Sequence, residues 1–293
     1  MRCFLGCAAV LMGLFGMEGS MASNEKGPPA GAILLWQDVP PFSSDEDTFQ
    51  PWLEAYPVET NEPRGAVLIC PGGGYTHRAG HEAAPIARAF NGDGLHAFVV
   101  QYRVSPHSHP APLYDAARAL RIIRSRAKQW NVDPEHIAIL GFSAGGHLAA
   151  SLGVFHDEAT PPDMNDEPLH QLSARPDALV LCYAVTAAGD ASLFGTLFNL
   201  LGRGPTREEQ HRLSPTHHVT EKTPPTFLWH TAEDDLVPPL QSLLFARALR
   251  SHGIPFELHV YAKGDHGMGL AVHDPHAATW QPLCAEWLQA MGW

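Results

Sequence analysis

A serine enclosed by glycines is the feature of this sequence with the most direct chemical meaning. Ser143 lies in the stretch Gly141–Gly145, which matches the pattern G-x-S-x-G. The apolar, strand-like segment His136–Leu140 precedes it, and the helix-like segment Ala144–Leu152 follows it at once. A serine in so sharp a strand-to-helix turn presents its hydroxyl above the sheet at the positive end of a helix. The pattern therefore favours a nucleophile over a glycine-rich turn with a capping serine.

A serine nucleophile needs a base, and the base needs a carboxylate that orients it. In this type of fold the acid and then the histidine follow the serine along the chain. The loop after the strand-like segment Thr226–His230 contains Asp234 and Asp235, and the loop after Phe256–Tyr261 contains His266. Both loops follow strands, and such loops lie at the ligand-binding edge of a parallel sheet. We expect His266 to be the general base, and either aspartate can be the acid.

Three consecutive glycines offer hydrogen-bond donors for an oxyanion. Gly72–Gly74 follow the apolar segment Ala66–Cys70, and their unobstructed amides can point at a developing negative charge. A G-x-G-x-x-G phosphate loop is the alternative, but the third glycine of that pattern is absent. We therefore predict an oxyanion hole made by amides of this glycine loop together with the amide of Ala144.

Histidine is abundant in this chain, with 18 residues, so each one needs its own argument. His147, four residues after the serine, is interpreted as a helix residue that is hydrogen-bonded beneath the turn. The pairs His107/His109 and His217/His218 lack a matching cysteine or carboxylate pattern, and we interpret them as solvated loop residues. The sequence thus predicts no metal site.

Apolar, strand-like segments alternate with amphipathic segments over most of the chain. The strand candidates are Trp52–Val58, Ala66–Cys70, Leu95–Gln101, His136–Leu140, Ala178–Cys182, Thr226–His230 and Phe256–Tyr261. The helix candidates are Glu82–Asn91, Leu113–Gln129, Ala144–Leu152, Pro239–His252 and His276–Ala290. Several strand candidates are apolar on both faces, which is typical of central parallel strands. The alternation predicts an α/β fold: a doubly wound, mostly parallel sheet with helices on both faces.

Two segments interrupt this alternation. Residues 23–49 are rich in proline and acidic residues, and we expect an irregular N-terminal arm there. Residues 186–225 are long for a strand-to-helix connection and contain their own helix candidates, which predicts a small lid-like insertion over the site. The remaining pattern predicts a single domain over residues 50–293.

The N-terminus has the pattern of a signal peptide. Arg2 precedes an apolar run over residues 4–17, which is short for a membrane span, and Ser20–Ala22 offers small residues for cleavage. We predict a signal peptide over residues 1–22 and a secreted or periplasmic location, with a misassigned start codon as the alternative. Of the five cysteines, Cys70 and Cys182 end apolar segments, which favours buried free thiols.

The net charge excludes some partners. The chain has 31 acidic and 19 basic residues, which gives a formal charge of −12. Nucleic acids and anionic membranes do not attract a protein of this charge, so we expect neither as a partner.

The ordered motifs resemble the α/β-hydrolases of the acetylesterase, acetyl-xylan-esterase-like group. The resembling stretches are PGGGY at 71–75, QYRV at 101–104, HPAPLYDAARALRIIRSRA at 109–127, GFSAGGHLAA at 141–150, PPTFLWHTAEDDLVPPLQSLLFARAL at 224–249 and KGDHGMGLA at 263–271. The resemblance covers nearly all of the chain from Gly65 onward.

The resemblance implies a role for each matching residue. Ser143 resembles the nucleophile and His266 the base. Asp234 resembles the acid, because Val237 stands three residues after it as in the D-x-x-V-P pattern of the group. The amides of Gly73 and Gly74 resemble the oxyanion loop of the group, and Tyr75 next to them is expected to contact the substrate.

The resemblance also implies a substrate class. It points to short acyl esters, notably acetyl groups on hemicellulose sugars such as acetylated xylan, hydrolysed without a cofactor. A general carboxylesterase acting on small or lipid-like esters is the main alternative. A peptidase is disfavoured because no propeller-length N-terminal region is present, and a non-catalytic binding scaffold is disfavoured because the serine, aspartate and histidine are all intact.

Overall fold

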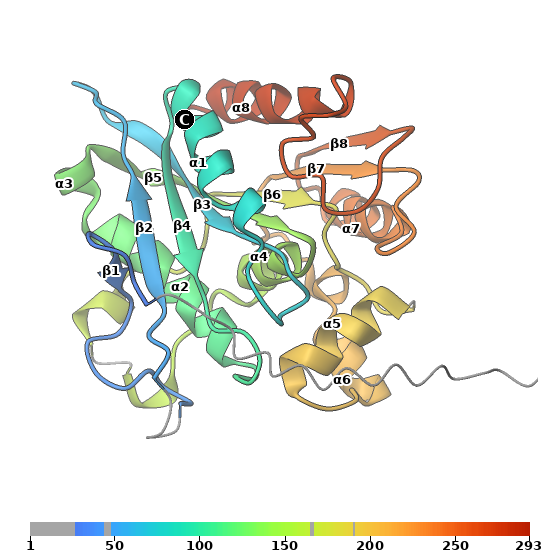
Figure 1. Cartoon of the computed structure of the whole chain (residues 1–293), viewed down its shortest axis with the longest axis horizontal. Helices are drawn as coiled ribbons and strands as arrows, with labels where there is room; N and C mark the ends of the chain where they lie inside the picture. The colour runs from blue at the N-terminus through green and yellow to red at the C-terminus, as the bar shows by residue number, and fades with distance from the viewer. Residues whose placement is uncertain (1–26, 44–47, 165–166, 190) are drawn as a thin grey trace, which may run out of the picture.

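An eight-stranded sheet organises the protein (Figure 1). The computed structural model describes residues 27–43, 48–164, 167–189 and 191–293, so the predicted signal peptide lies outside the described residues. The strands are β1 (Ile33–Leu34), β2 (Trp52–Tyr56), β3 (Arg64–Cys70), β4 (His96–Gln101), β5 (Val132–Phe142), β6 (Ala178–Cys182), β7 (Thr226–Thr231) and β8 (Phe256–Tyr261). All seven strand candidates are confirmed, β6 and β8 with the predicted ends and the other five with shifted ends, and β1 is an addition.

The sheet is mostly parallel. Its strand order is β1-β2-β4-β3-β5-β6-β7-β8. The strands from β4 to β8 across the sheet are parallel, whereas β2 runs antiparallel to β4 and to β1. The chain passes from β3 outward to β4 and then returns to place β5 on the other side of β3. The carboxyl ends of β3 and β5 therefore flank the point where the winding reverses, which is where such sheets bind ligands.

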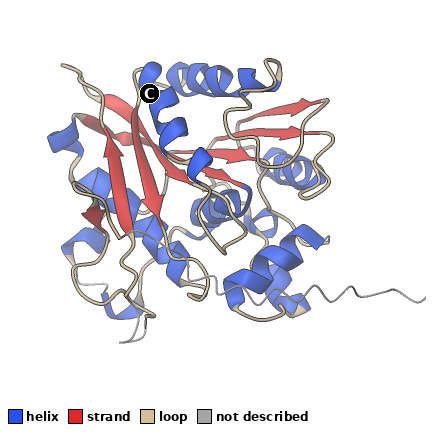
Figure 2. Cartoon of the chain, in the orientation of Figure 1, coloured by secondary structure: helices blue, strands red, loops and turns tan. Residues whose placement is uncertain are grey.

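Helices cover both faces of the sheet, as predicted (Figure 2). The main helices are α1 (Ala84–Gly92), α2 (Ala111–Ser125), α3 (Ala127–Trp130), α4 (Ser143–Phe155), α7 (Leu240–Ser251) and α8 (Trp280–Ala290). Side chains of α1 and α8 join one apolar cluster, and those of α2, α4 and α7 join another on the opposite face. The strands between these two clusters are apolar on both sides because both sides are covered.

The N-terminal arm is more regular than we expected. β1 pairs with the edge strand β2, and the buried Trp36 just after β1 donates from its indole nitrogen to Asp115 over 2.8 Å. Asp115 also forms an ion pair of 2.8 Å with Arg103, in which both side chains are fully buried. The arm is therefore fixed to the sheet edge by one strand pairing and by several polar contacts, which include donation from Arg118 to the Leu35 carbonyl oxygen and from Arg103 to that of Pro41.

The insertion over residues 186–225 contains the helices α5 (Ala191–Leu201) and α6 (Arg207–Arg212) and the short turn η4 (Pro215–His218). A capping box between Thr206 and Glu209 starts α6. In Figure 1, α5 and α6 lie apart from the layered helices. The predicted helices of the insertion are thus present.

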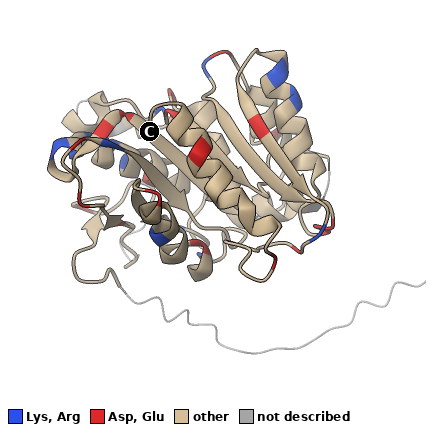
Figure 3. Ribbon diagram, turned by 90° about the horizontal axis from the view of Figure 1, so that it is seen from above, with Lys and Arg blue, Asp and Glu red and all other residues tan. Residues whose placement is uncertain are grey.

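Other global features agree with a globular protein. Cys70 and Cys182 are buried free thiols, as predicted, and so is Cys284. Figure 3 shows acidic and basic positions scattered over the ribbon and not gathered into a basic face. Among the residues that the structure describes, no helix has the length and apolar character needed to cross a bilayer.

Candidate active site

Ser143 stands in a strained turn between β5 and α4. Its φ of 52° lies in the left-handed region, which non-glycine residues rarely adopt. A Cβ atom at Gly141 would collide with the backbone of Gly145, and one at Gly145 would collide with the carbonyl groups of Cys70 and Pro71. The glycines of the motif are therefore required for the close packing of α4 against the end of β3.

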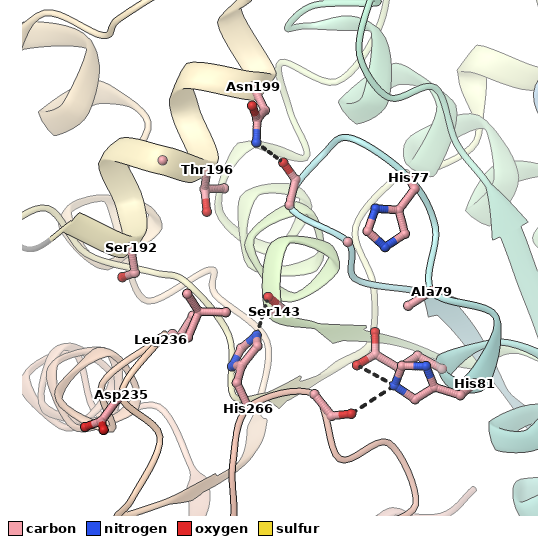
Figure 4. A pocket seen from close by; sticks show the side chains of 16 residues that line it. His77, Ala79, His81, Ser143, Ser192, Thr196, Asn199, Asp235, Leu236 and His266 are labelled. Carbon is pink, nitrogen blue, oxygen red and sulfur yellow. Dashed lines mark hydrogen bonds and ion pairs between the residues drawn. The ribbon is translucent and has the colours of Figure 1, made fainter. Parts of the chain in front are cut away.

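A hydrogen-bonded chain connects Ser143, His266 and Asp234. The His266 Nε2 atom lies 2.8 Å from Ser143 Oγ (Figure 4), and His266 Nδ1 lies 2.7 Å from Asp234 Oδ2. A carboxylate only accepts, so Nδ1 carries the proton and Nε2 faces the serine hydroxyl with its lone pair. The structure thus brings together the three residues that the sequence pointed to.

Asp234, and not Asp235, contacts the histidine. Asp234 is buried, and its second oxygen accepts from the backbone amides of Leu236 at 3.1 Å and Val237 at 2.8 Å. Asp235 is exposed and lies at the rim of the adjacent cavity (Figure 4). The choice that the residues alone left open is therefore decided by geometry.

Burial acts to raise the pKa of Asp234, but hydrogen bonds outweigh it. The donors are His230, His266 and the Val237 amide, and together they hold the pKa well below its usual value. The His230 Nε2–H is shared between the Val237 carbonyl oxygen at 2.7 Å and Asp234 Oδ2 at 3.4 Å, and Nδ1 accepts from the Ser242 hydroxyl at 2.8 Å. Sequence reasoning missed this fully buried histidine. It ends a strand candidate, and nothing in its position distinguishes it from other histidines.

The predicted oxyanion donors lie around the serine. Gly73 and Gly74 line the same cavity as Ser143, with φ values of 124° and 62° that favour glycine. Ala144 is the second residue of α4, so its amide has no partner within the helix. The amides of Gly73, Gly74 and Ala144 therefore remain the candidate donors for an oxyanion.

Tyr75 lies outside this cavity, contrary to the expectation that it contacts substrate. It is 1% exposed, and burial raises the pKa of its hydroxyl, which therefore stays protonated. The hydroxyl lies 3.0 Å from Nδ1 of His147, whose Nε2 donates to the Leu213 carbonyl oxygen at 2.8 Å. Tyr75 thus anchors the glycine loop to α4, and the interpretation of His147 as a buried, hydrogen-bonded residue is confirmed.

The paired histidines differ from our expectation in part. His107, His109 and His218 are half-buried and only His217 of these four is exposed, and burial lowers the pKa of His109 to about 4. Within the described residues, no group of three or more histidine, cysteine or acidic side chains could hold a metal ion.

A cavity of about 510 Å³ opens above Ser143. The glycine loop and His266 form one side of it. Helix α5 contributes Ser192, Thr196 and Asn199, which share one face of the helix at spacings of four and three residues (Figure 4). Leu236 and Val237 provide an apolar part of the wall. The cavity therefore combines an apolar wall with hydroxyl and amide groups.

Known proteins resemble this chain over most of its length. Endo-1,4-beta-xylanase B of Butyrivibrio fibrisolvens is 38% identical over 250 residues, which are 84% of this chain and 39% of that protein. Acetylxylan esterase of Xylanibacter ruminicola is 29% identical over 237 residues, which are 78% of this chain and 45% of that protein. The chain thus spans less than half the length of these curated relatives.

Solved structures show the same architecture. The crystal structure of an acetyl ester-xyloside bifunctional hydrolase from Caldicellulosiruptor lactoaceticus is 43% identical, with a TM-score of 0.85 over 91% of this chain and 98% of that one. MGS-M1, an α/β-hydrolase enzyme from a deep-sea metagenome library, has a TM-score of 0.68 at 29% identity, over 90% of this chain and 98% of that one. These structures confirm the predicted α/β-hydrolase fold. The BD-FAE family matches residues 55–249, more than half of the sequence, and the chain therefore belongs to the BD-FAE family of α/β-hydrolases.

Proposed function

We propose that this protein is a serine esterase that hydrolyses short-chain acyl esters, chiefly acetyl esters, on carbohydrate such as acetylated xylan. The observation that carries the proposal is the hydrogen-bonded chain from Ser143 through His266 to Asp234 at the floor of the cavity. The names of the relatives, which include an acetylxylan esterase and an acetyl ester-xyloside hydrolase, support the same class of substrate.

The mechanism has two acyl-transfer steps. His266 Nε2 takes the proton of Ser143 as its Oγ attacks the ester carbonyl carbon, and the amides of the glycine loop and Ala144 stabilise the oxyanion. The tetrahedral intermediate collapses when His266 returns the proton to the leaving alcohol oxygen. Water then attacks the acyl-enzyme with His266 again as base, which releases the acid and regenerates the serine. Asp234 keeps the imidazole in the required tautomer throughout.

The cavity supports a sugar as the alcohol part of the ester. Its volume lies within the range of small-molecule sites, roughly 300–1,000 Å³, and leaves room for much more than an acetyl group. The polar face of α5 offers Ser192, Thr196 and Asn199 to the hydroxyl groups of such an alcohol. A lipid-like alcohol offers few hydrogen-bonding groups to this polar face, so the lining of the cavity favours a sugar.

The test is hydrolysis of 4-nitrophenyl esters of increasing acyl length, with acetylated xylan alongside, for the wild type and Ser143→Ala. We expect acetate release from xylan and a steep fall in kcat/KM beyond short acyl chains. Activity confined to longer or artificial esters would support a general carboxylesterase instead. A folded Ser143→Ala variant with near-full activity would refute the serine mechanism.

We also propose that the protein is exported. Arg2, the apolar run over residues 4–17 and the small residues Ser20–Ala22 support cleavage after Ala22. N-terminal sequencing of the protein recovered from the native cell envelope or medium tests this. A mature N-terminus at Ser23 is the expected result, and intact protein confined to the cytoplasm would contradict export.

A further inference from the structure

Glu82 is a buried carboxylate beside the active site that the mechanism above does not use. It lies in the short turn η1 (Gly80–Glu82), between the glycine loop and α1, and is only 2% exposed. It also lines the cavity that contains Ser143. A buried acidic group needs hydrogen-bond donors, and the identity of those donors indicates its task.

Glu82 joins loops that follow three different strands. Its Oε2 atom accepts from the Gly72 amide, after β3, at 2.7 Å, and its Oε1 accepts from the Tyr183 hydroxyl, after β6, at 2.6 Å. The Tyr183 oxygen in turn accepts from the Gly269 amide, after β8, at 2.9 Å. One carboxylate therefore connects the oxyanion loop to the loop that carries His266.

Tyr183 also packs directly against the proposed base, His266. Its ring lies edge-on to the His266 ring, with centroids 5.0 Å apart and an interplanar angle of 69°. Burial first, and then the neighbouring Glu82, raise the pKa of the Tyr183 hydroxyl well above its usual value, so it remains a proton donor. The neighbouring His81 adds a parallel link, because its Nε2 donates to the Gly267 carbonyl oxygen over 2.9 Å (Figure 4).

We propose that Glu82 is a positioning residue, which holds the oxyanion loop and the His266 loop at the separation that acyl transfer needs. This inference rests on the proposed esterase function. Hydrogen bonds to a carboxylate are shorter and stronger than those between neutral groups, so they fix both loops more rigidly than an amide would. A misplacement of about 1 Å between donors and base can cost about 100-fold in rate.

A purely structural role would give a different pattern. A buried acid that only contributes to stability can be replaced without a selective loss of the chemical step. A positioning role predicts that kcat falls while KM changes little, because the oxyanion and the transferred proton exist only in the transition state. It also predicts that Glu82 and Tyr183 act as one unit, so that their substitutions are not additive.

The experiment compares wild type with Glu82→Gln, Tyr183→Phe and the double variant. The Tyr183→Phe variant keeps the ring against His266 and removes only the hydroxyl. Glu62→Gln, at an exposed acidic residue away from the site, is the matched control. Two rates are measured: phosphonylation of Ser143 by a fluorophosphonate probe, and turnover of 4-nitrophenyl acetate. Thermal unfolding monitors the fold of each variant.

We expect Glu82→Gln to lower both kcat and the phosphonylation rate roughly 10- to 100-fold with KM within about threefold of wild type. Tyr183→Phe should give a smaller loss, and the double variant should be no slower than Glu82→Gln alone. Folded variants whose two rates stay within twofold of wild type, or whose losses multiply, would overturn the inference. If Glu82→Gln does not fold, Tyr183→Phe carries the same test alone.

The two proposals fail in different ways. A wild-type protein that is phosphonylated at Ser143 but hydrolyses no ester refutes the proposed function, while the ratio of phosphonylation rates still tests Glu82. A wild-type protein whose serine is not phosphonylated at all overturns both.

Discussion

Asn199 on α5 donates a hydrogen bond from its side-chain amide to the Gly74 carbonyl oxygen over 2.7 Å (Figure 4). The insertion helix and the oxyanion loop are therefore joined directly. The contact orients the peptide group between Gly74 and Tyr75. Movement of α5 is thus coupled to the glycine loop that lines the cavity beside Ser143, and the insertion does more than cover the cavity.

Removal of this contact should slow the reaction. In Asn199→Leu the Gly74 carbonyl oxygen loses its donor, and a hydrogen bond contributes about 0.5–1.5 kcal/mol, so kcat/KM for 4-nitrophenyl acetate should fall roughly 3- to 10-fold. The control is Phe198→Ala, the adjacent residue, whose side chain is 49% exposed. Steady-state kinetics of both variants make the comparison. Equal losses in the two would contradict a specific role for Asn199.

Substitution of the two neighbouring aspartates should have very different effects. Asp234→Asn replaces the carboxylate that fixes the His266 tautomer, and we expect kcat to fall on the order of 10³- to 10⁴-fold. Asp235→Asn alters an exposed side chain and should change kcat less than threefold. Turnover of a short acyl ester measures both. A larger loss in Asp235→Asn would reverse the assignment of the acid.

Tyr75 should matter for stability more than for substrate binding. Tyr75→Phe removes the hydroxyl that His147 Nδ1 accepts, and the buried nitrogen is left without a donor, which costs about 1–3 kcal/mol. Urea unfolding should show this loss, whereas KM for small esters should stay within about twofold. A large rise in KM with unchanged stability would instead support direct contact with substrate.

Protonation of His147 should destabilise the fold in acid. Burial lowers the pKa of His147 to about 4, although the hydrogen bond to Leu213 opposes this shift. An unfolded chain takes up this proton near pH 6.5 and the folded chain only near pH 4, so folding free energy is lost as the pH falls through this window.

The size of the destabilisation in acid follows from the shift in the pKa of His147. At pH 5 the loss amounts to about 2 kcal/mol, since one pKa unit corresponds to about 1.4 kcal/mol. The free energy of unfolding of His147→Gln should therefore fall less between pH 7 and pH 5 than that of wild type, although it starts lower. His252→Gln, at an exposed histidine, is the control. Parallel pH profiles of His147→Gln and wild type would refute the explanation.

The buried ion pair of Arg103 and Asp115 should be far more important than an exposed one. Asp115→Asn leaves the guanidinium buried without its counter-charge, so we expect a loss of about 3–5 kcal/mol in unfolding free energy. Asp157→Asn removes an exposed partner of Lys222 and should cost at most about 1 kcal/mol. Denaturant titrations distinguish the two. Similar losses would show that the buried pair contributes little.

The strands and the candidate catalytic residues could be predicted from the sequence because short, continuous stretches of residues indicate them. Ala178–Cys182 is apolar throughout, as a strand covered on both faces must be, and the structure buries every one of its residues. Ser143 is marked by glycines that the turn requires. Asp234 and His266 both follow strands, and parallel strands bring such loops to one edge.

The features that we did not predict from the sequence depend on contacts between residues that are far apart in the chain. β1 has two residues and becomes a strand only because the edge of β2 offers it partners. Glu82 was included in a helix candidate as an ordinary helix residue, and its partners come from loops 10 and 101 residues away. The clearest sequence feature of Glu82 is that an acidic side chain stands at the start of an apolar segment. The motif led us to predict that Tyr75 contacts the substrate. Its burial depends on its contact with His147, which lies 72 residues further along the chain.

The position of β8 has a consequence for the thermal inactivation of the protein. The serine follows β5 in the middle of the sheet, whereas His266 follows β8, which lies at one edge and pairs with β7. Edge elements open locally before the centre of a sheet does. Detachment of this last strand separates base from nucleophile while most of the molecule keeps its shape. We therefore expect the proposed esterase activity to be lost on warming before the molecule unfolds as a whole, so that residual activity would report the attachment of the final strand.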